Sequence, residues 1–311
     1  MLNMTQTTKV SNFLMSKPAV QDNSRKLDQF YTDPAYAEQF LIKIGQTVDL
    51  DQYDHLLEPS AGTGSFYNLL DTNKRIGLDL DPKAVGVIQT DFFDWIPPAD
   101  KKIITIGNPP FGKSAGLAVK FFNRAAEFSD VIAFVIPRTF RKASIINRLA
   151  KQFHCIYDET VPDNSFIFNG ATYNVPCAAQ IWQRKATPRD RIVTIKLEQI
   201  RSWFELVEPS KSDFAIQRVG GRAGLIRTTN RMNFSAESHY FIKAHDSRVL
   251  PVFEKINFDT VKFNTAGNPS ISPSELIELW VAKTKEEGIN VVLDAVKSKK
   301  KELPAHLFVS E

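Results

Sequence analysis

The sequence predicts an α/β protein with an open, mostly parallel seven-stranded sheet and helices on both of its faces. Over the first two thirds of the 311-residue chain, short apolar runs alternate with amphipathic segments, which is typical of parallel strands joined by helices. A glycine-containing turn follows the first apolar run, and two consecutive prolines end the fourth. Turns at the strand ends of such a sheet are the usual place for a ligand.

The first helix is expected over residues 36–44, because Asp33 is a good N-cap and Pro34 suits the first helical position. Strands are expected at residues 55–58, 75–80, 85–89, 102–106, 131–136, 153–158 and 178–183. Helices are expected at residues 65–70, 117–127 and 144–152. These elements make up one unit, residues 27–185, which follows a polar and flexible arm at residues 1–26.

Regular alternation fades after Arg184, and basic residues become frequent. Residues 186–311 are therefore expected to form a smaller, basic, mixed α/β region, with helices at 274–285 and 290–300. The net charge of +4 is compatible with a nucleic-acid partner but is weak evidence for one. The polar loop at 264–273 has no assigned role.

The composition argues against several other classes of protein. No apolar stretch is long enough to cross a membrane, and the N-terminus lacks the apolar core of a signal peptide. Cys155 and Cys177 have no metal-type spacing. We therefore expect reduced thiols, no metal site and a cytoplasmic location, while the oligomeric state stays open.

The tetrapeptide Asn108-Pro109-Pro110-Phe111 follows the apolar run at residues 103–107. Two prolines fix φ and supply no N–H, so the strand must end there in a stiff, extended loop. Such a loop can hold the Asn108 amide oxygen and the Pro109 carbonyl as two acceptors for one planar NH₂ group. Phe111 offers a flat face to the ring that carries this group.

A second candidate site is the turn at residues 58–65, between a strand and a helix. Two glycines let a ligand approach the backbone closely, and the pattern matches neither common phosphate-binding motif. Glu58 would repel a phosphate and suits a cationic ligand. The candidate residues of the turn are Glu58, Ser60, Gly62 and Gly64.

Two further carboxylates follow the next strands. Asp79 stands where acidic residues bind ribose hydroxyls in nucleotide-binding α/β folds. Asp91 can accept a hydrogen bond from an adenine amine, and Phe92 can stack on the purine. Carboxylates near a cation, a ribose and an adenine are together what S-adenosylmethionine requires.

The order of these segments resembles the amino-methyltransferases that modify adenine N6, most of all the DNA enzymes whose cofactor motifs precede the catalytic one. The resemblance covers residues 26–183 and includes the segment Asp28-Gln29-Phe30-Tyr31-Thr32-Asp33-Pro34. It implies a Rossmann-like methyltransferase that uses S-adenosylmethionine. It also implies that Tyr31, Thr32 and Pro34 flank the methionine moiety, with Gly62 and Gly64 beneath the cofactor.

The predicted reaction is methyl transfer to the N6 amine of adenine in DNA. Asn108 and Pro109 would draw the amine hydrogens out of plane, and the target base would leave the duplex to reach them. Phe140 is expected to form the other wall of the base pocket, and Arg138 and Arg141 to hold phosphates. Arg218 and Arg222 are expected in a turn between strands that also contacts phosphates.

Three alternatives stay open. The same chemistry could act on adenine in RNA, which the tetrapeptide does not separate from DNA. A glutamine amide in a protein is less favoured, because those enzymes usually carry a preceding helical domain and Tyr as the fourth residue of the motif. A non-catalytic nucleic-acid-binding subunit is also less favoured, because both motifs are intact. A recognition sequence and a partner nuclease of a restriction-modification system cannot be predicted.

Overall fold

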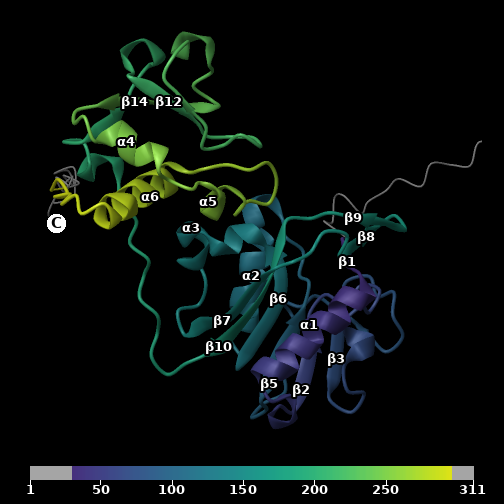
Figure 1. The fold of residues 1–311 in the computed structure, drawn as a ribbon. Helices are drawn as coiled ribbons and strands as arrows, with labels where there is room; N and C mark the ends of the chain where they lie inside the picture. The colour runs from purple at the N-terminus through teal and green to yellow at the C-terminus, as the bar shows by residue number, and fades with distance from the viewer. Residues whose placement is uncertain (1–29, 296–311) are drawn as a thin grey trace, which may run out of the picture.

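The computed structural model describes residues 30–295, and its main feature is a seven-stranded sheet (Figure 1). The strand order is β4-β3-β2-β5-β6-β10-β7. The strands are β2 (His55–Glu58), β3 (Arg75–Asp79), β4 (Ile88–Gln89), β5 (Ile103–Gly107), β6 (Val131–Pro137), β7 (Phe153–Thr160) and β10 (Cys177–Arg184).

Strands β4, β3, β2, β5 and β6 pair in parallel, whereas β10 is antiparallel to both β6 and β7. The chain runs outward from β2 to β4, then returns to the other side of β2 as β5. The order in which the chain adds strands to the sheet therefore reverses between β2 and β5. Ligands commonly bind at such a point. This Rossmann-like α/β fold confirms the predicted class.

Helices cover both faces of this sheet. Helix α1 (Pro34–Thr47) packs on one face, and α2 (Gly116–Ala125) with α3 (Ala143–Ile146) packs on the other (Figure 1). Successive side chains of a strand point to opposite faces. Ile104 and Ile106 accordingly join the core under α1, and Ile103 joins the core under α2.

Three predicted elements are shorter than expected. The turn after β2 leads to one 3-10 turn at Tyr67–Leu69, not to a helix at 65–70, because the backbone is already extended at Leu70, with a ψ of 151°. Strand β4 begins only at Ile88, since Gly86 has a φ of 86°. The helix expected at 144–152 is the four-residue α3.

A small three-stranded sheet lies beside the start of α1. It consists of β1 (Tyr31–Thr32), β8 (Phe166–Phe168) and β9 (Ala171–Tyr173), in the order β1-β8-β9. The β8–β9 hairpin turns at Asn169 and Gly170, which both have positive φ. This sheet joins the start of the described chain to a segment more than 130 residues later.

A four-stranded antiparallel sheet follows an extended segment after β10 (Figure 1). Its strands are β11 (Phe204–Leu206), β14 (His239–Ala244), β12 (Phe214–Gln217) and β13 (Ile226–Arg227), and its helices are α4 (Val249–Glu254), α5 (Asp259–Lys262) and α6 (Pro273–Glu286). These elements share a third apolar core around Trp280 and Phe204.

Helix α6 confirms the helix predicted at 274–285, and Ser272 with Glu275 forms its capping box. The helix predicted at 290–300 is absent over residues 290–295, and its remainder lies outside the described residues. Glu275 also pairs with Lys142 at 3.0 Å, which links α6 to the segment between β6 and α3.

None of the helices within residues 30–295 combines the length and apolarity needed to cross a bilayer. Over the same residues, His, Cys, Asp and Glu side chains form no group of three or more suited to a metal ion.

Candidate active site

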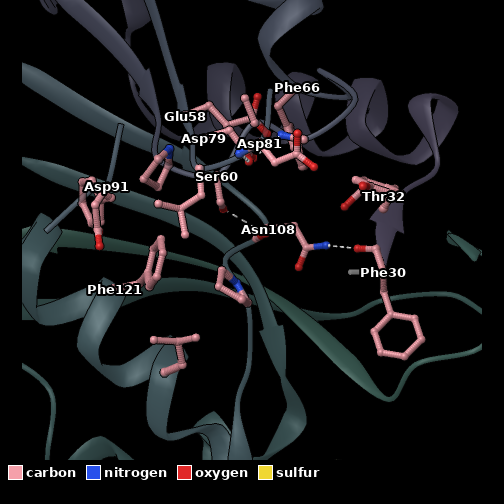
Figure 2. Close-up of a pocket in the computed structure, with 18 of the residues that line it drawn as sticks. Phe30, Thr32, Glu58, Ser60, Phe66, Asp79, Asp81, Asp91, Asn108 and Phe121 are labelled. Carbon is pink, nitrogen blue, oxygen red and sulfur yellow. Dashed lines mark hydrogen bonds between the residues drawn. The ribbon is translucent and has the colours of Figure 1, made fainter. Parts of the chain in front are cut away.

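A cavity of about 520 Å³ lies at the carboxyl ends of the parallel strands (Figure 2). Residues that follow β2, β3, β4 and β5 meet there, since parallel strands all end at the same edge. Thirteen of its lining residues, arranged by element, are Tyr31 and Thr32 of β1; Glu58 at the end of β2, with Ser60, Gly62 and Ser65 after it; Asp79 at the end of β3, with Asp81 after it; Asp91 and Phe92 after β4; and Asn108, Pro110 and Lys113 after β5.

The Asn108 side chain is held in one orientation. Its Nδ2 donates to the Phe30 carbonyl at 2.8 Å, as Figure 2 shows, and a carbonyl can only accept. The Oδ1 atom of the same amide is buried, and no donor among the described residues reaches it. Ser60 Oγ donates to the Asn108 backbone carbonyl at 3.3 Å and ties the two loops together. Asn108 therefore presents a fixed, unpaired acceptor.

The three residues after Asn108 take different positions. Pro110 lines the cavity, and Pro109 is buried. The Phe111 ring packs against both cores of the seven-stranded sheet and is not part of the cavity lining. The partly buried ring anchors the loop to the sheet, and a contact between Phe111 and a substrate stays a prediction.

The turn after β2 requires its first glycine. Gly62 has a φ of 50°, and a Cβ at this position would lie 2.7 Å from the Tyr31 ring. Its N–H donates to Asp79 Oδ2 at 2.7 Å. Gly64, with a φ of 84°, packs on Asn68 and Ala84 and is not among the lining residues.

Glu58 is almost fully buried at the end of β2. Its Oε2 accepts from the Tyr67 N–H at 2.6 Å. Removal from water raises the pKa of this carboxyl well above its usual range, although the Tyr67 hydrogen bond acts in the opposite direction. A cation in the cavity would favour the ionised form.

The carboxylates at the end of β3 and after β4 each accept a backbone hydrogen bond that stabilises the turn that follows. Asp79 Oδ1 accepts from the Asp81 N–H at 2.8 Å, and Asp91 Oδ1 accepts from the Phe93 N–H at 2.9 Å. Phe92 lines the cavity but is only 2% exposed, and its ring stacks on Phe121 at 5.2 Å. The apolar wall on this side is therefore shared between the two rings.

The β1 strand brings its predicted residues to the opposite side of the cavity. Ser65 Oγ donates to the Thr32 carbonyl at 2.6 Å. The Thr32 hydroxyl is buried without a partner among the described residues. Pro34 begins α1 and is not part of the lining.

The five predicted substrate-binding residues are not among the residues that line the cavity. Phe140 is fully buried against Phe122, which corrects the expectation that it forms a wall of the base pocket. Arg141 is paired with Asp158, so its charge is already balanced. Arg138 donates to the Cys177 carbonyl at 3.3 Å.

The other two arginines lie in the turn between β12 and β13, which confirms a turn between strands. Arg218 donates to the Glu237 carbonyl at 2.9 Å and lies over the Tyr240 ring. Arg222 is exposed at the turn. Its charge, unlike that of Arg141, has no ion-pair partner in the described part of the chain.

An aromatic cluster next to Asn108 was not predicted. The Phe30 ring stacks on Tyr173 at 5.3 Å and lies 5.3 Å from the Phe168 ring. The sequence held a signal for it, since Asn169-Gly170 between two β-rich triplets is a strong hairpin pattern. Lys113 was also missed, and no sequence pattern marks it.

Several solved structures are similar to about half of this chain. A protein from Pyrococcus horikoshii, provisionally named an RNA methyltransferase, aligns with 51% of this chain and 87% of its own length, at 20% identity and a TM-score of 0.42. The 23S rRNA methyltransferase ErmE aligns with 51% of this chain and 71% of its own length, at 18% identity and a TM-score of 0.38.

A type I restriction-modification methyltransferase subunit from Streptococcus thermophilus aligns with 51% of this chain and 45% of its own length, at 18% identity and a TM-score of 0.36. No protein-family model and no curated protein sequence matches this chain. At such identities and TM-scores, activity and substrate have to be argued from the site itself.

Proposed function

We propose that this protein transfers a methyl group from S-adenosylmethionine to the N6 amine of adenine in DNA. The observation that supports this most is the fixed, unpaired Asn108 Oδ1 inside a cavity at the sheet edge. An unpaired buried acceptor is costly unless a ligand satisfies it. An exocyclic amine, which carries two N–H donors, is a ligand that does so.

The cavity fits the proposed cofactor. Four carboxylates line it, Glu58, Asp79, Asp81 and Asp91, which suits a ligand with a sulfonium and an ammonium group. The unpartnered Thr32 hydroxyl can donate to a carboxylate, and Gly62 leaves the backbone open to close approach. When bound, S-adenosylmethionine supplies a methyl group on a positively charged sulfur, which makes it open to attack by nitrogen.

The chain's own residues would activate the amine. The Asn108 Oδ1 and the Pro109 carbonyl accept its two hydrogens, which favours a localised lone pair over one shared with the ring. The Asn108 acceptor is already oriented, because the Phe30 carbonyl fixes its amide, and two prolines stiffen the loop that carries the Pro109 carbonyl. Positioning and electrostatic stabilisation then account for most of the catalysis.

The aromatic cluster replaces Phe140 as the proposed wall for the target base. Phe30 connects it directly to Asn108 through the hydrogen bond to the Phe30 carbonyl. Tyr173 is 46% exposed, so part of its ring is open to contact a base. Stacking of this kind partly offsets the cost of taking a base out of a duplex.

We also propose that residues 27–185 form the methyltransferase unit and residues 186–311 contact nucleic acid. Arg222 is exposed at the β12–β13 turn, next to the backbone of Gly220 and Gly221. Contacts of this type bind phosphates and fix position without reading sequence. A cytoplasmic location agrees with a DNA substrate and belongs to the same proposal.

The test is transfer of labelled methyl from S-adenosylmethionine to matched duplex DNA, single-stranded DNA and RNA, followed by nucleoside mass spectrometry. The proposal predicts N6-methyladenine in DNA. Label in RNA alone would move the function to RNA modification with the same site. Label in none of the three, with cofactor bound, would contradict the proposed reaction on nucleic acid.

A further inference from the structure

Charge is divided unevenly around the cavity. Its four carboxylates all come from the segments after β2, β3 and β4. Lys113 is the single Lys or Arg side chain among the described lining residues, and it comes from the loop directly after Asn108-Pro109-Pro110-Phe111. The chain around the ends of β2, β3 and β4 therefore supplies the carboxylates of the described lining, and the loop that follows Asn108 supplies its one lysine.

The loop that carries Lys113 is held in an unusual conformation. Ser114 and Ala115 both have left-handed backbone angles, with φ of 53° and 59°. Gly112, with a φ of 66°, could not carry a Cβ, which would lie 2.7 Å from Leu117 Cβ. Left-handed non-glycine residues cost free energy and tend to occur at functional sites.

The loop is also fixed at its base. The Phe111 carbonyl accepts from both the Leu117 and the Ala118 N–H, at 3.1 and 3.2 Å. The Phe111 ring packs against both cores of the seven-stranded sheet. Lys113 is exposed, and within residues 30–295 its ammonium forms neither a hydrogen bond nor an ion pair. This loop thus places a positive charge, unpaired within residues 30–295, in the cavity lining that also contains the unpaired Asn108 acceptor.

We propose that Lys113 binds the phosphate group adjoining the target nucleotide and so positions the adenine at Asn108. This inference rests on the proposed function. A nucleotide in a strand enters the cavity joined to its sugar and phosphate, so an anion arrives together with the base. The four carboxylates of the lining repel that anion, and Lys113 attracts it.

The Lys113 ammonium could instead bind a second anion in the same cavity, the carboxylate of the cofactor. The Thr32 hydroxyl already offers a donor for that group on the β1 side. Lys113 as a phosphate ligand changes nucleic-acid affinity, and Lys113 as a cofactor ligand changes cofactor affinity. The two assignments are therefore separable by measuring each affinity on its own.

The experiment compares Lys113→Ala with Lys113→Arg and the control Lys120→Ala, which removes an exposed lysine of α2 outside the cavity. Initial rates are measured at saturating cofactor on an oligonucleotide with one mapped target adenine. We expect Lys113→Ala to raise KM for the oligonucleotide about tenfold and to lower the salt slope of binding by about 1. Lys113→Arg should restore most of the affinity, and Lys120→Ala should change little.

A neutral methylphosphonate at each phosphate flanking the target makes the assignment specific. If Lys113 contacts one of these two phosphates, then Lys113→Ala and wild type should differ in KM by less than about twofold on the oligonucleotide in which that phosphate is neutral. Equal effects of Lys113→Ala on the natural strand and on both modified strands would overturn the inference, as would a parallel loss of cofactor affinity. Wild-type protein that methylates no nucleic acid would instead contradict the proposed function itself.

Discussion

The side chains around the cavity differ in which of their polar atoms already have partners. Asp79 and Asp91 each use an oxygen to hold a backbone turn, and Glu58 holds the Tyr67 N–H. Asn108 Oδ1 and the Thr32 hydroxyl have no partner among the described residues. The groups that already have hydrogen-bond partners shape the cavity. The two groups without partners are the ones to which a ligand can form hydrogen bonds.

Glu58 gives a prediction about pH. Burial raises the pKa of Glu58 in the folded state. The residue therefore stabilises the fold at pH values below the ordinary pKa of Glu, and this contribution is lost as the pH rises toward the raised pKa. Glu58→Gln should remove this loss, so the variant should gain thermal stability relative to wild type as pH increases from 5 to 8. Differential scanning calorimetry across this range, with exposed Glu38→Gln as the control, measures the difference.

Cofactor binding should show the opposite dependence at the same residue. A bound cation favours ionised Glu58, so wild-type affinity for S-adenosylmethionine should increase with pH, and this increase should disappear in Glu58→Gln. The same pH profile in both proteins would mean that Glu58 does not titrate against the cofactor.

At the scale of elements, the sequence predicted strands better than helices. The strands of the central sheet are apolar and bounded by turn residues, a signal that lies within each segment. The segments at 65–70 and 144–152 have helical composition, but both make polar contacts outside themselves. Glu58 accepts from the Tyr67 N–H in the first, and Asn123 and Arg189 bond to the backbone of the second after α3 ends. Local patterns carry no information on such contacts.

The candidate site divides in the same way. Asn108, Asp79 and the Gly62 turn were predictable, because each follows a recognisable strand. The position of Phe140 was not predictable. A short loop with an aromatic residue has the same sequence pattern whether the ring is exposed or, as here, fully buried. The contact of Phe30 with Tyr173 also depends on pairing of β1 with β8, which no local pattern specifies, although Asn169-Gly170 marks the β8–β9 hairpin.

The β8–β9 hairpin supports a prediction of its own. Tyr173→Ala should raise KM for nucleic acid about tenfold or more, because base–aromatic stacking contributes about 1–3 kcal/mol. Tyr173→Phe keeps the ring and should behave as wild type. Affinity for S-adenosylmethionine, measured by calorimetry, should be the same in all three proteins. Unchanged kinetics of Tyr173→Ala would remove the hairpin from the base pocket.

At the scale of the whole molecule, the two larger sheets are connected by a contact that is mostly shielded from water. The Lys142 and Glu275 side chains are 17% and 13% exposed, and Glu275 also caps α6 through Ser272. This pair links the loop after β6 to the region that carries Arg222. It therefore helps to set how the proposed nucleic-acid surface faces the cavity.

Lys142→Ala should lower the free energy of unfolding by about 1–2 kcal/mol, because it leaves the Glu275 carboxylate without its cation. A double-mutant cycle with Glu275→Gln, followed by urea unfolding, gives the coupling between the two side chains. Lys101, whose pair with Asp54 is more exposed, is the matched control, and Lys101→Ala should cost far less. Strictly additive effects of Lys142 and Glu275 would show that the contact adds no stability.

The proposed reaction depends on Asn108 Oδ1 accepting a hydrogen bond from the amine that is methylated. The most direct measurement is single-turnover methyl transfer to DNA by Asn108→Ala with S-adenosylmethionine bound at saturation. We expect transfer to fall by about a hundred- to a thousandfold, while cofactor affinity stays within about twofold of wild type because Asp79, Gly62 and Thr32 are untouched. Transfer close to the wild-type rate, or an equal loss of transfer and cofactor affinity, would contradict it.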